Sequence, residues 1–151
     1  MFRHLLTLTC AAIFGAVTAM AIPARAAPLI TAEEAALPPQ KGAIPNSGRG
    51  ITRGPKIQVP EAETGVQTSP MRFQVKFQTF GGSSIDLEAL KVTYLKTPVV
   101  DLTPRIKPFA QSTGIDMPDA LLPPGDHLVR VDIKDSDGRA ASMSFLLKIA
   151  P

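Results

Sequence analysis

The C-terminal stretch 121–149, LLPPGDHLVRVDIKDSDGRAASMSFLLKI, contains two segments in which every second residue is apolar. A period of two is that of a β-strand with one buried face, and it excludes an amphipathic helix, whose period is 3.6. Between the segments lies the short polar run Asp135-Ser136-Asp137-Gly138, which is typical of a turn. The stretch therefore predicts a β-hairpin with these apolar residues on its buried face: Val129, Val131, Ile133, Met143, Phe145, Leu147 and Ile149.

Further short strands are predicted upstream of the hairpin. Residues 70–78 alternate between apolar and polar side chains, so we expect a strand there with Met71, Phe73, Val75 and Phe77 facing the core. Shorter strands are expected at 56–60, 90–95 and 99–102, with a loop at 80–84 and one helical turn at 85–90. Four prolines between 98 and 118 disfavour a long regular element, so extended segments are expected at 103–109 and a loop or helical turn at 116–120. Five to seven short strands without a helix of normal length predict an all-β sandwich.

The first 26 residues have the form of an export signal. They combine Arg3, an apolar run over 5–22, Pro23 and the small-residue motif Ala24-Arg25-Ala26. We therefore expect a signal peptide over 1–26, a periplasmic or secreted location and no transmembrane anchor after cleavage. A retained membrane helix is the minor alternative, because Pro23 and the cleavage motif follow the apolar run directly. Cys10 is the only cysteine, so the mature chain cannot form an internal disulfide.

Residues 27–54 are rich in proline, glycine, alanine and serine and show no sustained periodicity, which predicts a disordered linker. Thr31 and Glu34 have capping-box spacing, so a short helix over 31–37 is an alternative for part of this segment. A docking peptide or a strand that pairs with a partner is a further alternative. Residues 55–151 are long enough for one folded domain.

The charge balance disfavours nucleic acid as a partner. The whole chain carries 16 Lys and Arg against 13 Asp and Glu, and removal of Arg3 and Arg25 with the signal leaves 14 against 13. No run of basic residues is present and aromatic residues make up only 5% of the chain. Neither an electrostatic footprint nor a stacking platform for bases is therefore expected.

The spacing of the hairpin residues resembles the last two strands of bacterial immunoglobulin-like and fibronectin-III-like domains. The resemblance rests on Leu122-Pro123-Pro124-Gly125, His127, the alternating apolar residues that follow and Gly138, and upstream on Thr68-Ser69-Pro70, Ile85-Asp86-Leu87, Leu90 and Val92. It implies an immunoglobulin-like β-sandwich of about seven short strands. Related families act as adhesins, spacers, carbohydrate-associated modules or assembly subunits, and the periplasmic copper-resistance proteins bind copper. The chain departs from antibody-type domains because it lacks the Cys pair and the core Trp, and His127 stands where many such domains have a corner tyrosine.

Two groups of residues are candidates for metal binding. Asp135 and Asp137 precede Gly138 as in a calcium loop, but Ile133 stands where a further ligand belongs and the closing Glu is absent. His127 is the only histidine of the mature chain and has no Cys or His partner for a zinc site.

Copper binding at His127 would need help from methionines. Met71, Met117 and Met143 are available, yet Met71 and Met143 fall on predicted apolar faces, and the predicted mature N-terminus Ala27-Pro28 has no histidine. We therefore predict that His127 and the 135–137 turn are structural, and that the chain has no metal site and no cofactor.

No catalytic constellation is evident: the mature chain has no cysteine nucleophile, no nucleophile elbow and no glycine-rich phosphate loop. The sequence thus predicts no catalytic residue and no enzyme, but an exported immunoglobulin-like module that serves binding, spacer or assembly roles in the bacterial envelope, with a protein partner. The alternative is a periplasmic copper-binding protein of the copper-resistance type, centred on His127. A third hypothesis, a hydrolase accessory that binds polysaccharide, is disfavoured because the chain has no Trp and only Tyr94. Ligand, partner identity and oligomeric state stay open at this level.

Overall fold

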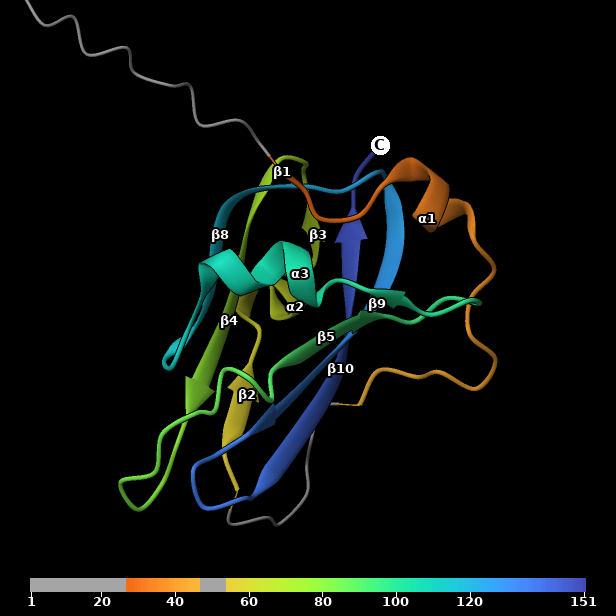
Figure 1. Cartoon of the computed structure of the whole chain (residues 1–151). Coiled ribbons are helices and arrows are strands. Elements are labelled where there is room, and N and C mark those ends of the chain that lie inside the picture. The colour runs from red at the N-terminus through yellow and green to blue at the C-terminus, as the bar shows by residue number, and fades with distance from the viewer. Residues whose placement is uncertain (1–26, 47–53) are drawn as a thin grey trace, which may run out of the picture.

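The computed structural model describes residues 27–46 and 54–151, which fold into two β-sheets (Figure 1). The predicted signal peptide, 1–26, lies outside the described residues. The first sheet has the order β1 (Ala27–Pro28), β8 (Gly114–Leu121), β4 (Met71–Gln78) and β2 (Lys56–Gln58), with β7 (Ala110–Gln111) also paired to β8. The second has the order β3 (Val66–Gln67), β10 (Ala140–Ile149), β9 (Gly125–Lys134), β5 (Lys91–Tyr94) and β6 (Val100–Asp101). The chain is thus predominantly β-structure in two sheets, compatible with the predicted sandwich.

The predicted hairpin is confirmed as β9 and β10, which pair antiparallel along their whole length, from Ala140 opposite Lys134 to Ile149 opposite Gly125. Every predicted inward residue of the hairpin is buried except Met143, which is partly buried. The strand β4 is confirmed in the same way, since its four apolar side chains are buried and their neighbours are not. Phe73 of β4 and Phe145 of β10 stack across the core with ring centroids 6.2 Å apart. One hydrophobic core therefore joins the two sheets.

Residues 103–109 are helical rather than extended, which corrects the prediction. They form α3 (Thr103–Ile106) and the 3₁₀ turn η1 (Lys107–Phe109). Pro104 and Pro108 each lie in the first turn of their helix. A backbone N–H in the first turn makes no hydrogen bond within the helix, so the missing N–H of proline costs nothing there, and the fixed φ of proline is compatible with a helix. Ile106, which is fully buried, attaches this segment to the core.

Residues 116–120 are part of the strand β8 and not a loop, which is a second correction. Opposite β4 the register passes from Met117–Phe73 to Ala120–Met71, so Pro118 and Asp119 together face the single residue Arg72. This bulge accommodates a proline that has no N–H to give to the ladder. It also keeps Met117 and Ala120 both in the core although they are three residues apart.

Two smaller differences concern single helical turns. Residues 85–90 form no helix: Ile85 bridges to Asp135, and the Asp86 carboxylate accepts a hydrogen bond from the Glu88 N–H. A short helix instead follows β2, since Pro60 begins α2 (Pro60–Glu63) at a position that favours proline.

Residues 27–46, which we call the N-terminal strap, pack on the sandwich, so the predicted disordered linker over 27–54 does not hold for this part; residues 47–53 lie outside the described residues. The strap begins with β1, which runs parallel to the end of β8. Leu29 and Ile30 follow with 0% and 2% of their surface exposed, and both of their N–H groups donate to the Leu121 carbonyl oxygen. The strap is the orange segment that runs from β1 through α1 and down one side of the molecule in Figure 1.

The helix α1 (Ala32–Ala36) of the strap has the capping box suggested by the sequence. The Thr31 hydroxyl accepts from the Glu34 N–H at 3.2 Å, and the Glu34 carboxylate accepts from the Thr31 N–H at 2.9 Å. The other end of the helix is held by Lys96, whose Nζ donates to the carbonyls of Ala35 and Leu37, both at 2.9 Å. Both helix ends therefore have partners, which a five-residue helix needs because it is too short to be stable alone.

An ion pair fastens α1 to α3. Arg105 donates to both carboxylate oxygens of Glu34, at 2.8 and 2.6 Å, and to the Leu29 carbonyl at 2.9 Å. The hydrogen bond from Arg105 is the main reason that the pKa of Glu34 falls from 4.5 to about 2. The charged form of Glu34 is thus favoured in the folded state.

The Glu34 shift gives a testable pH dependence. A carboxyl whose pKa is lowered on folding stabilises the protein above its unfolded pKa, and this contribution is lost as the pH falls from about 4.5 towards about 2. We expect the urea midpoint of the wild type to fall more steeply across this window than that of Glu34→Gln. The control is Glu33→Gln, which removes an exposed carboxylate from the same helix. Equal slopes for wild type and Glu34→Gln would show that the pair does not hold the strap.

Candidate functional site

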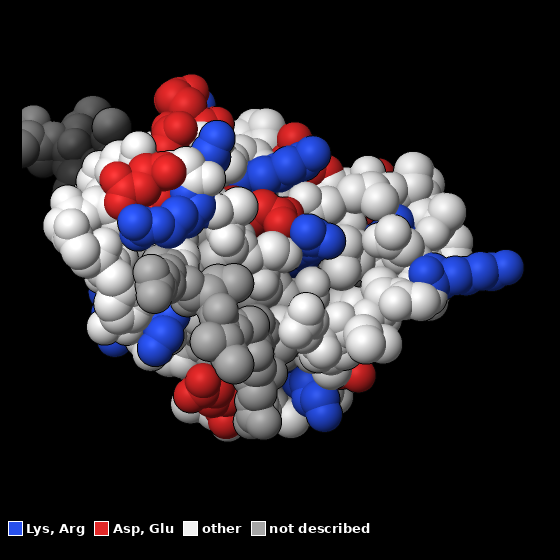
Figure 2. Space-filling view, turned by 90° about the horizontal axis from the view of Figure 1, so that it is seen from below, with Lys and Arg blue, Asp and Glu red and all other residues white. Residues whose placement is uncertain are grey.

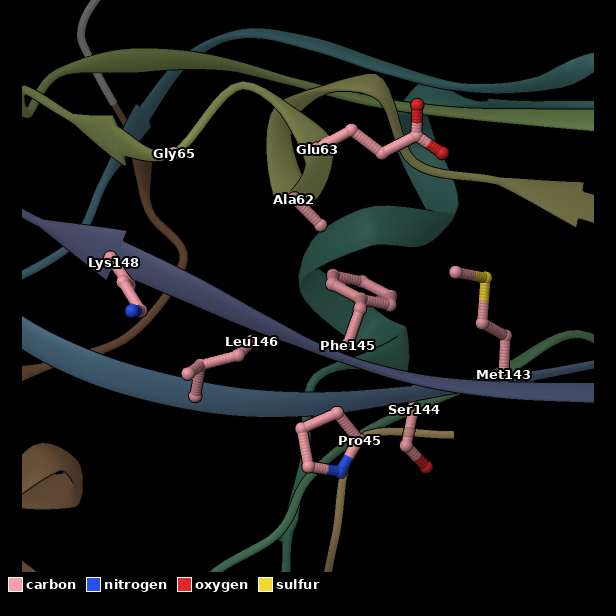
Figure 3. A pocket seen from close by; sticks show the side chains of 9 residues that line it. All are labelled: Pro45, Ala62, Glu63, Gly65, Met143, Ser144, Phe145, Leu146 and Lys148. Carbon is pink, nitrogen blue, oxygen red and sulfur yellow. The ribbon is translucent and has the colours of Figure 1, made fainter. Parts of the chain in front are cut away.

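A groove with a volume of about 380 Å³ runs along the outer edge of β10, between α2 and β3 on one side and the end of the strap on the other (Figure 3). A volume of this size lies within the range of pockets that bind small ligands or side chains of a partner. Its lining residues come from three parts of the chain: Pro45 from the strap, Ala62, Glu63 and Gly65 around α2, and Met143, Ser144, Phe145, Leu146 and Lys148 from β10.

Within residues 27–46 and 54–151, the edge of β10 around the groove is paired on either side of Leu146. Asn46 of the strap pairs with Ser144 through two backbone hydrogen bonds of 2.8 and 3.1 Å. Further along, Val66 of β3 pairs with Lys148 in parallel register. Leu146 lies between these points and has no paired residue on this edge within 27–46 and 54–151. In a strand, the N–H and C=O groups of every second residue point to the same edge. The backbone groups of Ser144 point to Asn46, so the N–H and C=O of Leu146, two residues later, point to the groove.

The walls of the groove are largely apolar. Figure 3 shows Phe145, Met143 and the Ala62 side chain on one side of β10, and Pro45 and Leu146 on the other. Exposed apolar residues continue the surface on both flanks, since Val66 next to Lys148 is 64% exposed and Ile44 before Pro45 is 72% exposed. A strand edge with a free donor and acceptor beside apolar walls is suited to an extended peptide.

The structure places His127 in the core. Its side chain is 1% exposed, its Nε2 lies 2.7 Å from the Pro123 carbonyl oxygen and its Nδ1 lies 2.9 Å from the Tyr94 hydroxyl. Because a carbonyl only accepts, Nε2 carries the proton, and Nδ1 accepts from Tyr94. Burial lowers the pKa of His127 and raises the pKa of Tyr94 to about 12, so both groups stay neutral at pH 7.

These contacts give His127 a structural role. Its hydrogen bond to the Pro123 carbonyl links β9 to the turn that precedes it. His127 thus makes a hydrogen bond at the position where many immunoglobulin-like domains have a corner tyrosine. The methionines considered as copper ligands are elsewhere: Met71 and Met117 lie on the first sheet, whereas His127 lies on the second. Met143 lines the groove. Within the described residues, no three His, Cys, Asp or Glu side chains are grouped as a metal site.

The Asp135 side chain organises the β9–β10 turn. Its Oδ1 accepts from the N–H groups of Asp137 and Arg139 at 3.1 and 2.8 Å. The Asp137 carboxylate pairs with Arg139 at 3.0 Å, and Gly138 adopts a positive φ of 81°. The two carboxylates considered for calcium are therefore bonded within the turn.

Charges of both signs are interspersed around this turn. Figure 2 looks onto the end of the sandwich that carries it, and shows acidic and basic side chains next to one another over that face. Such a surface has no strong field of one sign to attract a polyelectrolyte. In the described part of the chain, no helix has the length and apolar character needed to cross a membrane.

The groove is not predicted by the sequence. Its apolar walls were recognised in part, because Phe145 and Met143 belong to the predicted hairpin, but nothing local indicates that β3 and Asn46 leave Leu146 unpaired between them. Comparison with known proteins adds no relative: no family model, no curated protein and no solved structure matches this chain.

Proposed function

We propose that this chain is an exported, non-catalytic immunoglobulin-like module of the bacterial envelope, and that the β10 groove binds an extended segment of a partner protein. The observation that carries the proposal is the Leu146 backbone, which presents an N–H and a C=O to an apolar groove between two covered parts of the same strand edge. The proposal that the chain is exported rests on residues 1–26, which have the form of a signal peptide.

The groove fits a peptide better than a small polar ligand. A peptide supplies one acceptor and one donor to Leu146 in the geometry of a β-ladder, and this pairing is independent of the peptide sequence. The walls formed by Met143, Ala62 and Pro45 then select apolar side chains on alternate residues. Glu63 and Lys148 at the rim are of opposite charge, so the groove favours a segment without strong net charge.

Selection from a phage-displayed library of random peptides against the mature protein tests this function. We expect enriched peptides with alternating apolar residues, and a shift of the Leu146 amide resonance when a selected peptide is added. Ala62→Arg should weaken peptide binding at least about tenfold, because the long charged side chain projects from α2 into the groove. Ala36→Arg is the matched control, because Ala36 is an exposed alanine of another short helix, α1, and this variant should bind the selected peptides as tightly as the wild type.

Either of two results would contradict the proposal: no peptide family is enriched, or the selected peptides bind Ala62→Arg as tightly as Ala36→Arg. A peptide that shifts resonances only at other strands would equally place the binding site elsewhere.

A further inference from the structure

The outward face of the first sheet carries a second hollow, on β2, β4, β7 and β8, with a volume of about 600 Å³. It shares no lining residue with the β10 groove. Its polar lining residues are four glutamines, one threonine and one residue of each charge: Gln58, Gln74, Gln78, Gln111, Thr113, Lys76 and Asp116. Its other lining residues are Val75, Phe77, Gly114 and Ile115.

The strand register explains both the hollow and its composition. Gln58, Lys76 and Gly114 stand opposite one another on β2, β4 and β8, and Gln111 of β7 pairs with Gly114 on the far side. Gly114 therefore leaves a gap in an otherwise continuous row of long polar side chains. A Cβ at this position would lie 2.1 Å from the Val75 carbonyl oxygen, so the close approach of the two backbones requires glycine here.

The hollow is lined by one basic and one acidic residue, Lys76 and Asp116. Arg72 donates from Nε to the Asp116 carboxylate at 2.7 Å, in a pair that lies at one end of the hollow. Lys76 is the one basic residue of the lining and lies among four glutamines. A polyanion is bound by several basic side chains, so this lining does not suit one. Each glutamine amide offers a donor and an acceptor, and a sugar hydroxyl is likewise both donor and acceptor.

An exposed aromatic ring lies beside Lys56, outside the lining of the hollow. Phe80 is 39% exposed, and the amino group of Lys56, which pairs in register with Gln78, lies 5.2 Å from its ring centroid. The lack of Trp and the presence of only Tyr94 in the sequence disfavour polysaccharide binding. Tyr94 is indeed fully buried, but Phe80 supplies a ring at the surface.

We infer that this face binds a neutral polysaccharide, with Gln58, Gln74 and Gln111 bonding to its hydroxyl groups and Phe80 contacting a sugar ring. The site is independent of the proposed peptide groove. It gives the module a second kind of partner, an uncharged glycan chain, while the groove takes a peptide.

The test is affinity electrophoresis of the folded mature protein in gels that contain dextran, hydroxyethyl cellulose or glycol chitin, with polygalacturonate as the anionic comparison. We expect at least one neutral polymer to retard the protein. The double variant Gln58→Ala/Gln111→Ala should bind that polymer about tenfold more weakly, as expected for the loss of two hydrogen bonds between neutral groups. Gln40→Ala, an exposed glutamine on the strap, is the matched control.

A second readout locates the ligand. The side-chain amide resonances of Gln58, Gln74 and Gln111 should shift with the retarding polymer, and Ala62→Arg in the peptide groove should leave retardation unchanged. The inference is overturned if no neutral polymer retards the protein, if the double variant is retarded like Gln40→Ala, or if only polygalacturonate binds. None of these results bears on peptide binding to the groove, so the two proposals fail separately.

Discussion

Replacement of Leu29 by alanine is expected to lower the free energy of unfolding by about 2–5 kcal/mol. Leu29 is completely buried, and the N–H groups of Leu29 and Ile30 both donate to Leu121, so the site cannot collapse easily around a smaller side chain. The loss combines the transfer of apolar surface with the cavity left behind. Urea denaturation of the protein, followed by circular dichroism, measures this change in the free energy of unfolding.

Ile44→Ala is the matched control for Leu29→Ala. Ile44 belongs to the same strap and is similar in size, but 72% of its surface is exposed, so its truncation should change stability by less than about 0.5 kcal/mol. If the strap were a disordered linker, neither substitution would change the free energy of unfolding. Equal small effects at the two positions would therefore contradict the packing of the strap.

The second large effect is expected for His127→Leu, which should lower the free energy of unfolding by about 2–5 kcal/mol. Leucine fills most of the space but leaves the Pro123 carbonyl and the Tyr94 hydroxyl without their buried partner. Tyr94→Phe removes one hydroxyl only and should cost about 1 kcal/mol. The double variant should lose less than the sum of the single variants, because the leucine no longer faces an unsatisfied hydroxyl.

The same histidine predicts a pH dependence in the opposite direction from that of a histidine with an acidic partner. Because burial lowers the pKa of His127 below 6.5, the unfolded chain binds a proton more readily, and stability falls as the pH drops below about 6.5. The decrease in stability ends once the pH is below the pKa of His127 in the folded protein. His127→Leu should not show this decrease, because it has no imidazole to protonate. Strict additivity in the double variant, or a wild type whose stability is constant over this range, would show that His127 is not a buried, bonded neutral side chain.

The strands that the sequence predicts best are those with one dry and one wet face. In β4, β9 and β10 the two-residue period is set by the core alone, so the alternating residues identify both the strand and its buried side. The Thr31–Glu34 capping box was also readable, because both of its partners lie within four residues.

The features that the sequence predicts poorly depend on distant contacts. In β8 the bulge at Pro118 shifts the alternation by one residue, so Met117 and Ala120 do not fit a single period. Prolines at 104 and 108 suggested extended chain, although their places in the first turns of α3 and η1 are compatible with helix. The strap has only four large apolar residues, Leu29, Ile30, Leu37 and Ile44. Its attachment rests on Leu29 and Ile30 together with Arg105 and Lys96, which come from another part of the chain.

The candidate sites show the same division. Local spacing was sufficient to interpret Asp135 and Asp137 as turn residues, because their hydrogen bonds are with the next few residues. The β10 groove depends on which segments cover a strand edge, and the glutamine face depends on the register of four strands. Neither is encoded in any one stretch of sequence.

Backbone amide hydrogen exchange of the protein, resolved by NMR, tests the central claim that Leu146 is open on the β10 edge between the points where the folded strap and β3 pair with that strand. We predict slow exchange at Leu29, Ile30, Asn46 and Ser144, whose N–H groups are hydrogen-bonded, and fast exchange at Leu146 until a groove-binding peptide is added. Strap amides that exchange as fast as those of an unfolded chain would contradict the folded strap. A Leu146 amide as protected as that of Ser144 without peptide would contradict the open strand edge.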